Sequence, residues 1–360
     1  MSITTTHQLF MALSALSPTI GAMNLISAVP DADLEPSVRN FANSADIQKV
    51  AGAIEALTAK AGLSMPDATD QVKNVVQERH FYGTFCELAA YDWFARNGVE
   101  FNAQVNLGRA DVLNPRGCAI DGEFTAVNAY FDIKGFGMQA YLMKLFREAL
   151  RASVPDLFVT IDGPMDVGIK DIETYAFGQL SRTIPSLKQG AIVKIAQLGW
   201  TIRVQAPTKR IIMSEHTDDP YVFAENNRYY TLKTSRQFTR NAPFVMVFPY
   251  AARFNNMLSL NPFEGTDIAL RALARRTFLQ LHSDTSSLSA YDKQTAPGLT
   301  VADASKLLSA MLFVNVDKDD GWLFLNPRAT HKFTKNHVEH IFDFTIPVGL
   351  GIDDFRNDDY

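Results

Sequence analysis

The sequence predicts a mixed α/β protein in which short strands and helices follow a helical N-terminal region. The 360 residues are 47% hydrophobic and include 25 phenylalanines, so the chain can bury a substantial core. Apolar residues between Asp46 and Ala61 recur at close to the helical period. After Gly98 this pattern gives way to short apolar runs that favour strands. The expected regions are a helical part over 1–75, a core over 76–250 and a mixed α/β part over 251–360.

Composition narrows the class of protein. The net charge of −5 does not indicate a nucleic-acid-binding protein, although local basic clusters are compatible with a phosphate-binding groove. Only two cysteines occur, Cys86 and Cys118, which favours a reducing compartment, and we expect a cytoplasmic protein. Residues 1–30 carry no Asp, Glu, Lys or Arg, but they lack the basic start of a signal peptide. Pro18 and Gly21 interrupt the apolar run, so we expect packed helical structure there and no membrane span.

Helical patterns dominate the chain before Gly98. We expect residues 7–61 to be largely helical and the chain to break at Gly62–Pro66. Asp67 suits a helix N-cap. From there one helical pattern can continue to Gly98, where glycine is the common residue just past a helix end.

Strands and helices are mixed along the rest of the chain. The expected strands and β-like runs are Phe101–Leu107, Gly117–Thr125, Ala129–Lys134, Leu157–Ile161, Ile192–Val204, Lys209–Met213, Phe244–Phe248 and Trp322–Leu325. The expected helices are Gln139–Ala152, Tyr230–Thr239, Thr266–Leu281 and Val301–Leu312. The run Phe244–Phe248 is continuously apolar, which is typical of a strand buried on both faces.

An aspartate and a lysine alternate on the third expected strand. Because side chains alternate along a strand, Tyr130, Asp132 and Lys134 share one face while Phe131 and Ile133 lie on the other. A carboxylate and an ammonium side by side suit a hard metal ion with a positioned water beside it. Lys134 should stay protonated next to acids and stabilise negative charge on a phosphate.

Two further acids complete the candidate site. Asp121 lies on the preceding expected strand, and Glu87 lies on a helix upstream, on one stripe with Tyr91. The chemistry that fits is metal-assisted phosphodiester hydrolysis, because Mg²⁺ is commonly held by one or two carboxylates together with waters and phosphate. Asp121 and Asp132 can supply those oxygens, with the Ile133 carbonyl as a further ligand, and we expect Mn²⁺ to substitute for Mg²⁺.

The order of these residues resembles the PD-(D/E)xK nuclease superfamily, which has the restriction-endonuclease-like fold. The resemblance covers about residues 76–136. It implies a mixed sheet core flanked by helices, built as a helix, three strands, a helix and a fourth strand. It assigns metal binding to Asp121 and Asp132, the catalytic lysine to Lys134, and a second-metal or outer-shell position to Glu87. In this sequence Asp121 follows an isoleucine instead of the usual proline, and Asp132 is the less usual acid at its position.

This resemblance implies a Mg²⁺-dependent endonuclease. Because the family mostly cleaves DNA, DNA is favoured over RNA as the nucleic-acid partner. A homodimer would suit double-strand cutting, since that reaction needs two sites. Restriction or phage defence would fit a free-standing nuclease.

Two segments could supply the closing helix and strand of such a core. One is Gln139–Ala152 with Leu157–Ile161, and the other is Leu232–Thr239 with Phe244–Phe248, which makes 140–230 an insertion. The second arrangement is favoured. In it Arg236 or Gln237 could reach a phosphate, and on the third strand Tyr130 could stack on a base.

Other interpretations remain open at the level of sequence. Asp132 and Lys134 could be an ion pair on the surface of an edge strand, with Asp121 in a turn and Glu87 an ordinary solvated helix residue. The chain could keep a nuclease fold without activity and act as a nucleic-acid-binding or assembly module. It could also be an α/β enzyme for a small phosphorylated molecule. Mn²⁺ affinity that is lost when Asp132 is replaced would separate an enzyme site from an ion pair.

Overall fold

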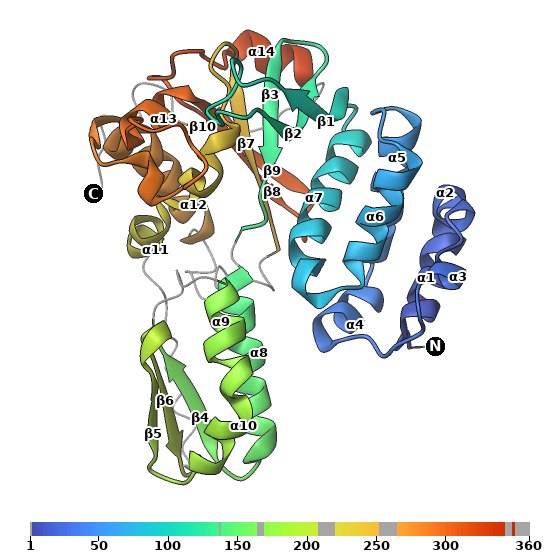
Figure 1. Cartoon of the computed structure of the whole chain (residues 1–360), viewed down its shortest axis with the longest axis vertical. Helices are drawn as coiled ribbons and strands as arrows, with labels where there is room; N and C mark the ends of the chain where they lie inside the picture. Colours follow the sequence, from blue (N-terminus) through green and yellow to red (C-terminus); the bar gives the residue numbers. More distant parts are fainter. Residues whose placement is uncertain are drawn as a thin grey trace. The chain divides into compact units, whose positions relative to one another are not determined.

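The computed structural model describes residues 2–136, 138–163, 169–207, 220–251, 265–342 and 348–349. These residues form mixed α/β structure, as the sequence predicts. The chain divides into two compact units (Figure 1). The first unit comprises Met1–Gly135, Arg228–Tyr250 and Leu270–Tyr360, and the second comprises Phe136–Asn227 and Ala251–Ala269.

The N-terminal region of the first unit is helical, which confirms the prediction for residues 7–61. Its helices are α1 (Thr6–Leu16), α2 (Pro18–Ala22), α3 (Leu25–Ala28), α4 (Pro36–Ala42), α5 (Asp46–Ala59), α6 (Met65–Val75) and α7 (Glu78–Arg96). Helix α1 begins with a capping box, in which the Thr5 side chain and the Gln8 side chain each bind the other's backbone N–H. The Ser17 hydroxyl caps the N-terminus of α2 by accepting a hydrogen bond from the backbone N–H of Ile20.

One predicted helix is in fact two. The N-cap of α6 is Ser64, whose hydroxyl accepts from the backbone N–H of Asp67, so the prediction of Asp67 as the cap was wrong. The helix ends at Val75, and α7 begins at Glu78. Gln77 between them has an extended backbone with φ −96° and ψ 112°, which breaks the helical pattern. The turn lets α6 pack beside α7, where both helices border the candidate site.

The first unit is built around a seven-stranded mixed sheet in the order β1-β2-β3-β7-β8-β9-β10. The strands are β1 (Phe101–Leu107), β2 (Cys118–Phe124), β3 (Ala129–Ile133), β7 (Phe244–Tyr250), β8 (Leu308–Asn315), β9 (Asp320–Leu325) and β10 (Val348–Gly349). The pairs β1–β2, β2–β3 and β8–β9 are antiparallel, whereas β3–β7, β7–β8 and β9–β10 are parallel. Strand β7, and not the strand near residue 160, therefore lies next to β3, as the favoured arrangement predicted.

Helix α7 is anchored to the sheet by aromatic side chains. Phe94 makes edge contacts with Phe124 and Phe131 at ring-centroid distances of 5.6 and 5.3 Å. Tyr91 stacks on Phe101 at 5.4 Å. Glycine at position 122 is needed for this packing, because a Cβ there would lie 2.4 Å from both the Asn102 carbonyl oxygen and Phe131 Cζ. The aromatic core thus fixes the helix that carries Glu87 against the strands that carry the aspartates.

The second unit contains a three-stranded antiparallel sheet with helices on one side (Figure 1). Its elements are α8 (Met138–Ser153), β4 (Phe158–Asp162), α9 (Ile169–Tyr175), α10 (Leu180–Thr183), β5 (Ile192–Ile195), β6 (Trp200–Gln205) and α11 (Pro220–Asn227). The strand order is β4-β6-β5. Phe146 on α8 packs against the buried Trp200 at 6.0 Å between ring centroids. The expected β-like run Lys209–Met213 lies outside the described residues.

Helix predictions in the C-terminal half need correction. Helix α13 (Val301–Leu307) ends five residues earlier than expected, and the chain continues as β8, which is buried along its whole length. A short apolar run fits either a buried helix or a buried strand, so periodicity alone could not separate them. Tyr230–Gln237 is a 3₁₀ helix that is kinked at Thr234, not a regular α-helix. Helix α12 (Gly265–Arg275) continues as a π turn over Arg276–Gln280, and α14 (Lys335–Ile341) follows β9.

No helix within the described ranges combines the length and the apolar character that crossing a membrane requires.

Candidate active site

The candidate site forms where β2 and β3 stop pairing. Their register ends with Gly122 opposite Phe131. Beyond that point the Asp121 carboxylate takes the place of a backbone partner, because its Oδ2 accepts the Ile133 N–H at 2.6 Å. On the other side, the Tyr91 hydroxyl donates to the Asp121 carbonyl at 2.7 Å. Asp121 is therefore held by both its side chain and its backbone.

Asp132 and Lys134 form an ion pair beside Asp121. Lys134 Nζ lies 2.8 Å from Asp132 Oδ2 and 3.8 Å from Asp121 Oδ2. The Asp132 side chain has no exposed surface, and its Oδ1 has no hydrogen-bond partner among the described residues. Strand β3 lies between β2 and β7 and is not an edge strand. These observations contradict the interpretation of Asp132 and Lys134 as a surface ion pair on an edge strand.

Glu87 enters the site from α7 and is held by two amides. Its Oε1 accepts from Gln71 Nε2 on α6 at 3.0 Å and from Gln104 Nε2 on β1 at 3.2 Å. Beside it lies a hollow of about 500 Å³. This hollow is lined by Leu63, Asp67, Asp70, Gln71, Asn74, Thr84, Glu87, Gln104, Asn106, Ala119 and Asp121. Glu87 and Asp121 thus border the same space, and most of its wall is oxygen- or amide-bearing.

Burial and mutual charge perturb the ionisation of these groups. Burial, reinforced by the charge of Asp121, raises the pKa of Glu87 to about 8. The same two causes hold the pKa of Asp132 well above its ordinary value. Burial alone would favour the neutral amine of Lys134, but the charges of Asp132 and Asp121 outweigh it and raise the pKa of this ammonium. Lys134 is therefore a cation at neutral pH, whereas the raised pKa values favour the protonated carboxyls of Glu87 and Asp132, and a divalent cation bound there would have to displace protons.

The oxygen ligands suit a divalent cation of the Mg²⁺ type. Within the described residues, no group of three or more His, Cys, Asp or Glu side chains is arranged to hold a metal ion, so a cage made of protein ligands alone is not formed there. Mg²⁺ does not need one, because it usually keeps several waters and binds through one or two carboxylates. The buried, unpartnered Oδ1 of Asp132 and the carboxylate of Asp121 provide that smaller set. The residues fit a hard metal ion completed by water and a phosphate.

Two of the three residues predicted to contact substrate, Arg236 and Gln237, have partners within the protein. The Arg236 guanidinium lies 3.3 Å from the Asp292 carboxylate, so its charge is balanced within the protein. Gln237 donates to the Ala119 carbonyl at 3.2 Å, next to the wall of the hollow. Tyr130 is half-buried on β3, two residues before Asp132. Contacts of these three side chains with phosphate or base stay predictions.

Two residues of the site were not predicted. Gln71 and Gln104 lie 16 and 17 positions from Glu87 in the sequence, and they meet it only after α6 turns back along α7 and β1 joins the sheet. Neither residue belongs to a periodic pattern that would mark it. Tyr91 was predicted on the Glu87 stripe, but its hydrogen bond to the Asp121 carbonyl depends on the packing of α7 against the sheet.

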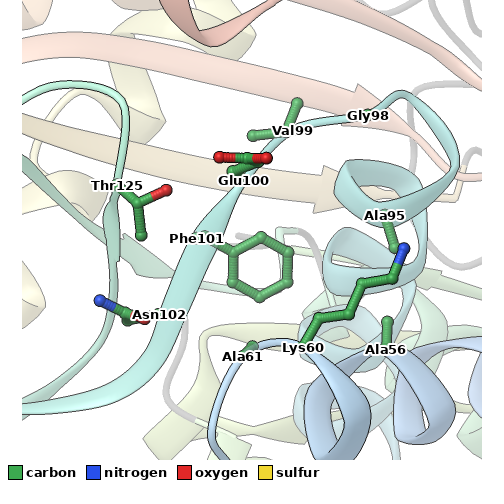
Figure 2. A pocket seen from close by; sticks show the side chains of 10 residues that line it. All are labelled: Ala56, Lys60, Ala61, Ala95, Gly98, Val99, Glu100, Phe101, Asn102 and Thr125. Atoms are coloured by element: carbon green, nitrogen blue, oxygen red, sulfur yellow. The ribbon is translucent and has the colours of Figure 1, made fainter.

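A second hollow of about 630 Å³ lies where the C-terminal ends of α5 and α7 approach β1. It is lined by Ala56, Lys60, Ala61, Ala95, Gly98, Val99, Glu100, Phe101, Asn102 and Thr125 (Figure 2). Its only ionisable side chains are Lys60 and Glu100, both exposed. None of the predicted site residues lines it. Glu87 and Asp121 line the other hollow instead.

Comparison with known proteins identifies no relative of this chain. No protein-family model, no curated protein and no solved structure matches the chain. A function therefore has to be inferred from the geometry and chemistry of the site itself.

Proposed function

We propose that the chain is a metal-dependent nuclease that hydrolyses phosphodiester bonds, with DNA favoured over RNA. The observation that carries the proposal is the position of Lys134 Nζ, which lies 2.8 Å from Asp132 and 3.8 Å from Asp121. Asp132 is fully buried. A structural ion pair has no use for a buried oxygen without a partner, whereas such an oxygen can serve as a metal ligand.

The strand order supports the same proposal. Helix α7 precedes the antiparallel strands β1, β2 and β3, and β7 then pairs with β3 in parallel. The resemblance to the PD-(D/E)xK nucleases implies a helix, three strands, a helix and a fourth strand, and here the kinked 3₁₀ helix Tyr230–Gln237 stands in the place of the second helix. The chain between β3 and β7 includes Phe136–Asn227, the larger segment of the second unit, so we propose a restriction-endonuclease-like core with a folded insertion.

The roles of the side chains follow from their charges and positions. Mg²⁺ or Mn²⁺ held by Asp121 and Asp132 would polarise the phosphate and lower the pKa of a bound water. Lys134 remains an ammonium and can donate hydrogen bonds to a phosphate oxygen, which stabilises the negative charge that develops as water attacks phosphorus. Glu87 borders the same hollow as Asp121 and would hold a second metal ion or act from an outer position. In the reaction one P–O bond forms to the water oxygen, and the bond to the leaving oxygen breaks as that oxygen gains a proton.

A cleavage assay tests this proposal. Purified protein is incubated with Mg²⁺ or Mn²⁺ and with supercoiled, linear, modified or single-stranded DNA, or with RNA. Asp132→Ala and Lys134→Ala should each lower the rate by about a hundredfold or more, because they remove a metal ligand and a transition-state cation. Asp162→Asn is the matched control, since Asp162 is an exposed partner of Arg203 in the second unit.

The outcomes separate the candidate functions. Metal-dependent cleavage that both variants abolish, with circular dichroism unchanged, supports the nuclease and identifies its polymer. Binding of nucleic acid without cleavage at any metal concentration would favour the inactive binding module. Hydrolysis of mononucleotides alone would contradict a polymer substrate.

A further inference from the structure

Gln104 has an unusual backbone for a strand residue. In the middle of β1 its φ is 53°, in the left-handed region. Within the described residues, the other non-glycine positions with positive φ are Asn24 and Asp319. Asparagine and aspartate are the types that tolerate this conformation, whereas glutamine is not among them. The protein thus maintains a strained residue at a position where an extended one would continue the strand.

The strain falls opposite Asp121. The β1–β2 register pairs Ala103 with Gly122 and Val105 with Ile120, which leaves Gln104 facing Asp121 without a ladder pairing. Strained backbone persists where the surrounding structure enforces it, and such positions cluster at functional sites. Gln104 therefore lies where a functional role of its side chain is expected.

The Gln104 side chain is part of a network that joins three elements. Its Nε2 donates to Glu87 Oε1 at 3.2 Å, and Gln71 Nε2 donates to the same oxygen at 3.0 Å. Gln104 also has a hydrogen bond with Tyr91, whose hydroxyl donates to the Asp121 carbonyl. Both amides use a single carboxylate oxygen, so they fix the direction of the Glu87 carboxylate while engaging only Oε1.

We propose that Gln71 and Gln104 are positioning residues that clamp the Glu87 carboxylate relative to Asp121. The clamp requires Gln104 to adopt its strained, left-handed backbone conformation. The inference rests on the proposed nuclease function. Outer partners that orient ligand carboxylates typically change metal affinity or activity by about 10- to 100-fold when they are removed. A residue that only stabilised β1 would have no such effect.

The test combines Gln104→Gly and Glu87→Ala in a double-mutant cycle, with Asn102→Gly as the control. Asn102 is an exposed residue of the same strand. Glycine adopts a positive φ freely, so Gln104→Gly should keep the unfolding temperature of the metal-free protein at or above that of wild type, whereas Asn102→Gly should lower it. Gln104→Gly should also weaken Mn²⁺ binding in calorimetry and lower kcat by about 10- to 100-fold, with KM for DNA unchanged.

The double-mutant cycle shows whether Gln104 affects Mn²⁺ affinity and kcat through Glu87. In the Glu87→Ala background, Gln104→Gly should change Mn²⁺ affinity and kcat by less than about twofold, because the clamped group is already gone. Gln71→Ala should likewise weaken Mn²⁺ binding and lower kcat in the wild-type background and have little effect in the Glu87→Ala background. A Gln104→Gly protein that is less stable than wild type but equal to it in Mn²⁺ affinity and kcat would overturn the clamp.

The clamp and the nuclease proposal fail in different ways. If wild type cleaves DNA and Gln104→Gly cleaves it equally well, the clamp is wrong and the nuclease stands. If no polymer is cleaved but Mn²⁺ affinity follows the cycle, the clamp stands as part of a metal site and the nuclease is wrong. If wild type neither binds Mn²⁺ nor cleaves a polymer, both are overturned.

Discussion

At the scale of single residues, the opposing charges of the site meet at Lys134. Its ammonium lies between two aspartates, one of them fully buried, at 2.8 and 3.8 Å. An unpaired buried carboxylate is unfavourable, so Lys134 stabilises the metal-free protein. The same cation must repel a metal ion that binds to those carboxylates. In the proposed nuclease, Lys134 would therefore oppose metal binding while it stabilises the transition state.

Replacing Lys134 should separate these two roles. In Lys134→Gln, Mn²⁺ affinity should be equal to that of wild type or higher, because the competing cation is gone. The cleavage rate should fall by about a hundredfold or more, since the cation that stabilises the transition state is lost. Calorimetry and a single-turnover cleavage assay measure the two effects on one preparation. A parallel loss of metal affinity and rate would mean that Lys134 only organises the aspartates.

Strand alternation allowed part of the site to be predicted from the sequence. Spacing placed Asp132 and Lys134 on one face, and the structure brings both to Asp121. The full burial of Asp132 could not be predicted, because it depends on β7 lying beside β3. Gln104 was missed because its contact with Glu87 depends on a left-handed backbone, which no residue pattern signals for glutamine.

At the scale of elements, β2 needs glycine at position 122. A Cβ there would overlap the Asn102 carbonyl and the Phe131 ring. Gly122→Ala should therefore destabilise the protein by about 1–3 kcal/mol or more. Gly83 on α7 is the matched control, because a Cβ there meets nothing within 4 Å and alanine favours a helix by about 1 kcal/mol. Urea unfolding of the two variants should give shifts of opposite sign, and equal shifts would contradict this packing.

The junction of α1, α2 and α5 should respond to pH through Glu55. Its Oε1 accepts from the Ser17 hydroxyl at 2.5 Å and from the Thr19 N–H at 3.0 Å, and these bonds hold the pKa of Glu55 below its ordinary value of 4.5. A carboxyl with a lowered pKa contributes stability above its unfolded pKa and loses that contribution as pH falls through the folded value.

Glu55→Gln should thus be less stable than wild type at pH 7, and the difference should shrink as the pH falls below about 4. Thermal unfolding of both proteins between pH 3 and pH 7 measures this. A difference that did not depend on pH would assign the effect to packing and not to the charge of Glu55.

The boundaries of β1 to β3 were predictable, whereas one continuously apolar segment was assigned to the wrong type of element. The strand Phe101–Leu107 has the predicted bounds, β2 is one residue shorter than predicted at each end, and β3 is one residue shorter at its C-terminal end. By contrast, 308–312 was expected to be helical and is a strand buried along its whole length. Its conformation is set by pairing with β7 and β9, which local sequence does not contain.

At the scale of the whole molecule, the candidate site belongs to one of two compact units. Asp121, Asp132, Lys134 and Glu87 all lie in the first unit, and the core of the second is built around Trp200. A change in the core of the second unit should therefore leave the proposed metal ligands in place. That separation is testable by substitution.

Trp200→Ala should destabilise the second unit by about 3–5 kcal/mol, because a fully buried large aromatic is removed. Mn²⁺ affinity should stay within about twofold of wild type, since the ligands are in the other unit. Calorimetry measures the affinity, and limited proteolysis reports the loosened unit. A large loss of Mn²⁺ binding would show that the site depends on the second unit.

The most direct test of the account is Mn²⁺ titration of metal-free wild type, Asp132→Asn and the control Asp162→Asn. Asp132 is the buried carboxylate with an unpartnered oxygen, whereas Asp162 is exposed and paired with Arg203. We predict that wild type and Asp162→Asn bind Mn²⁺ alike and that Asp132→Asn binds at least about a hundredfold more weakly. Equal binding by all three proteins, or no binding by wild type, would contradict a metal site at Asp121 and Asp132.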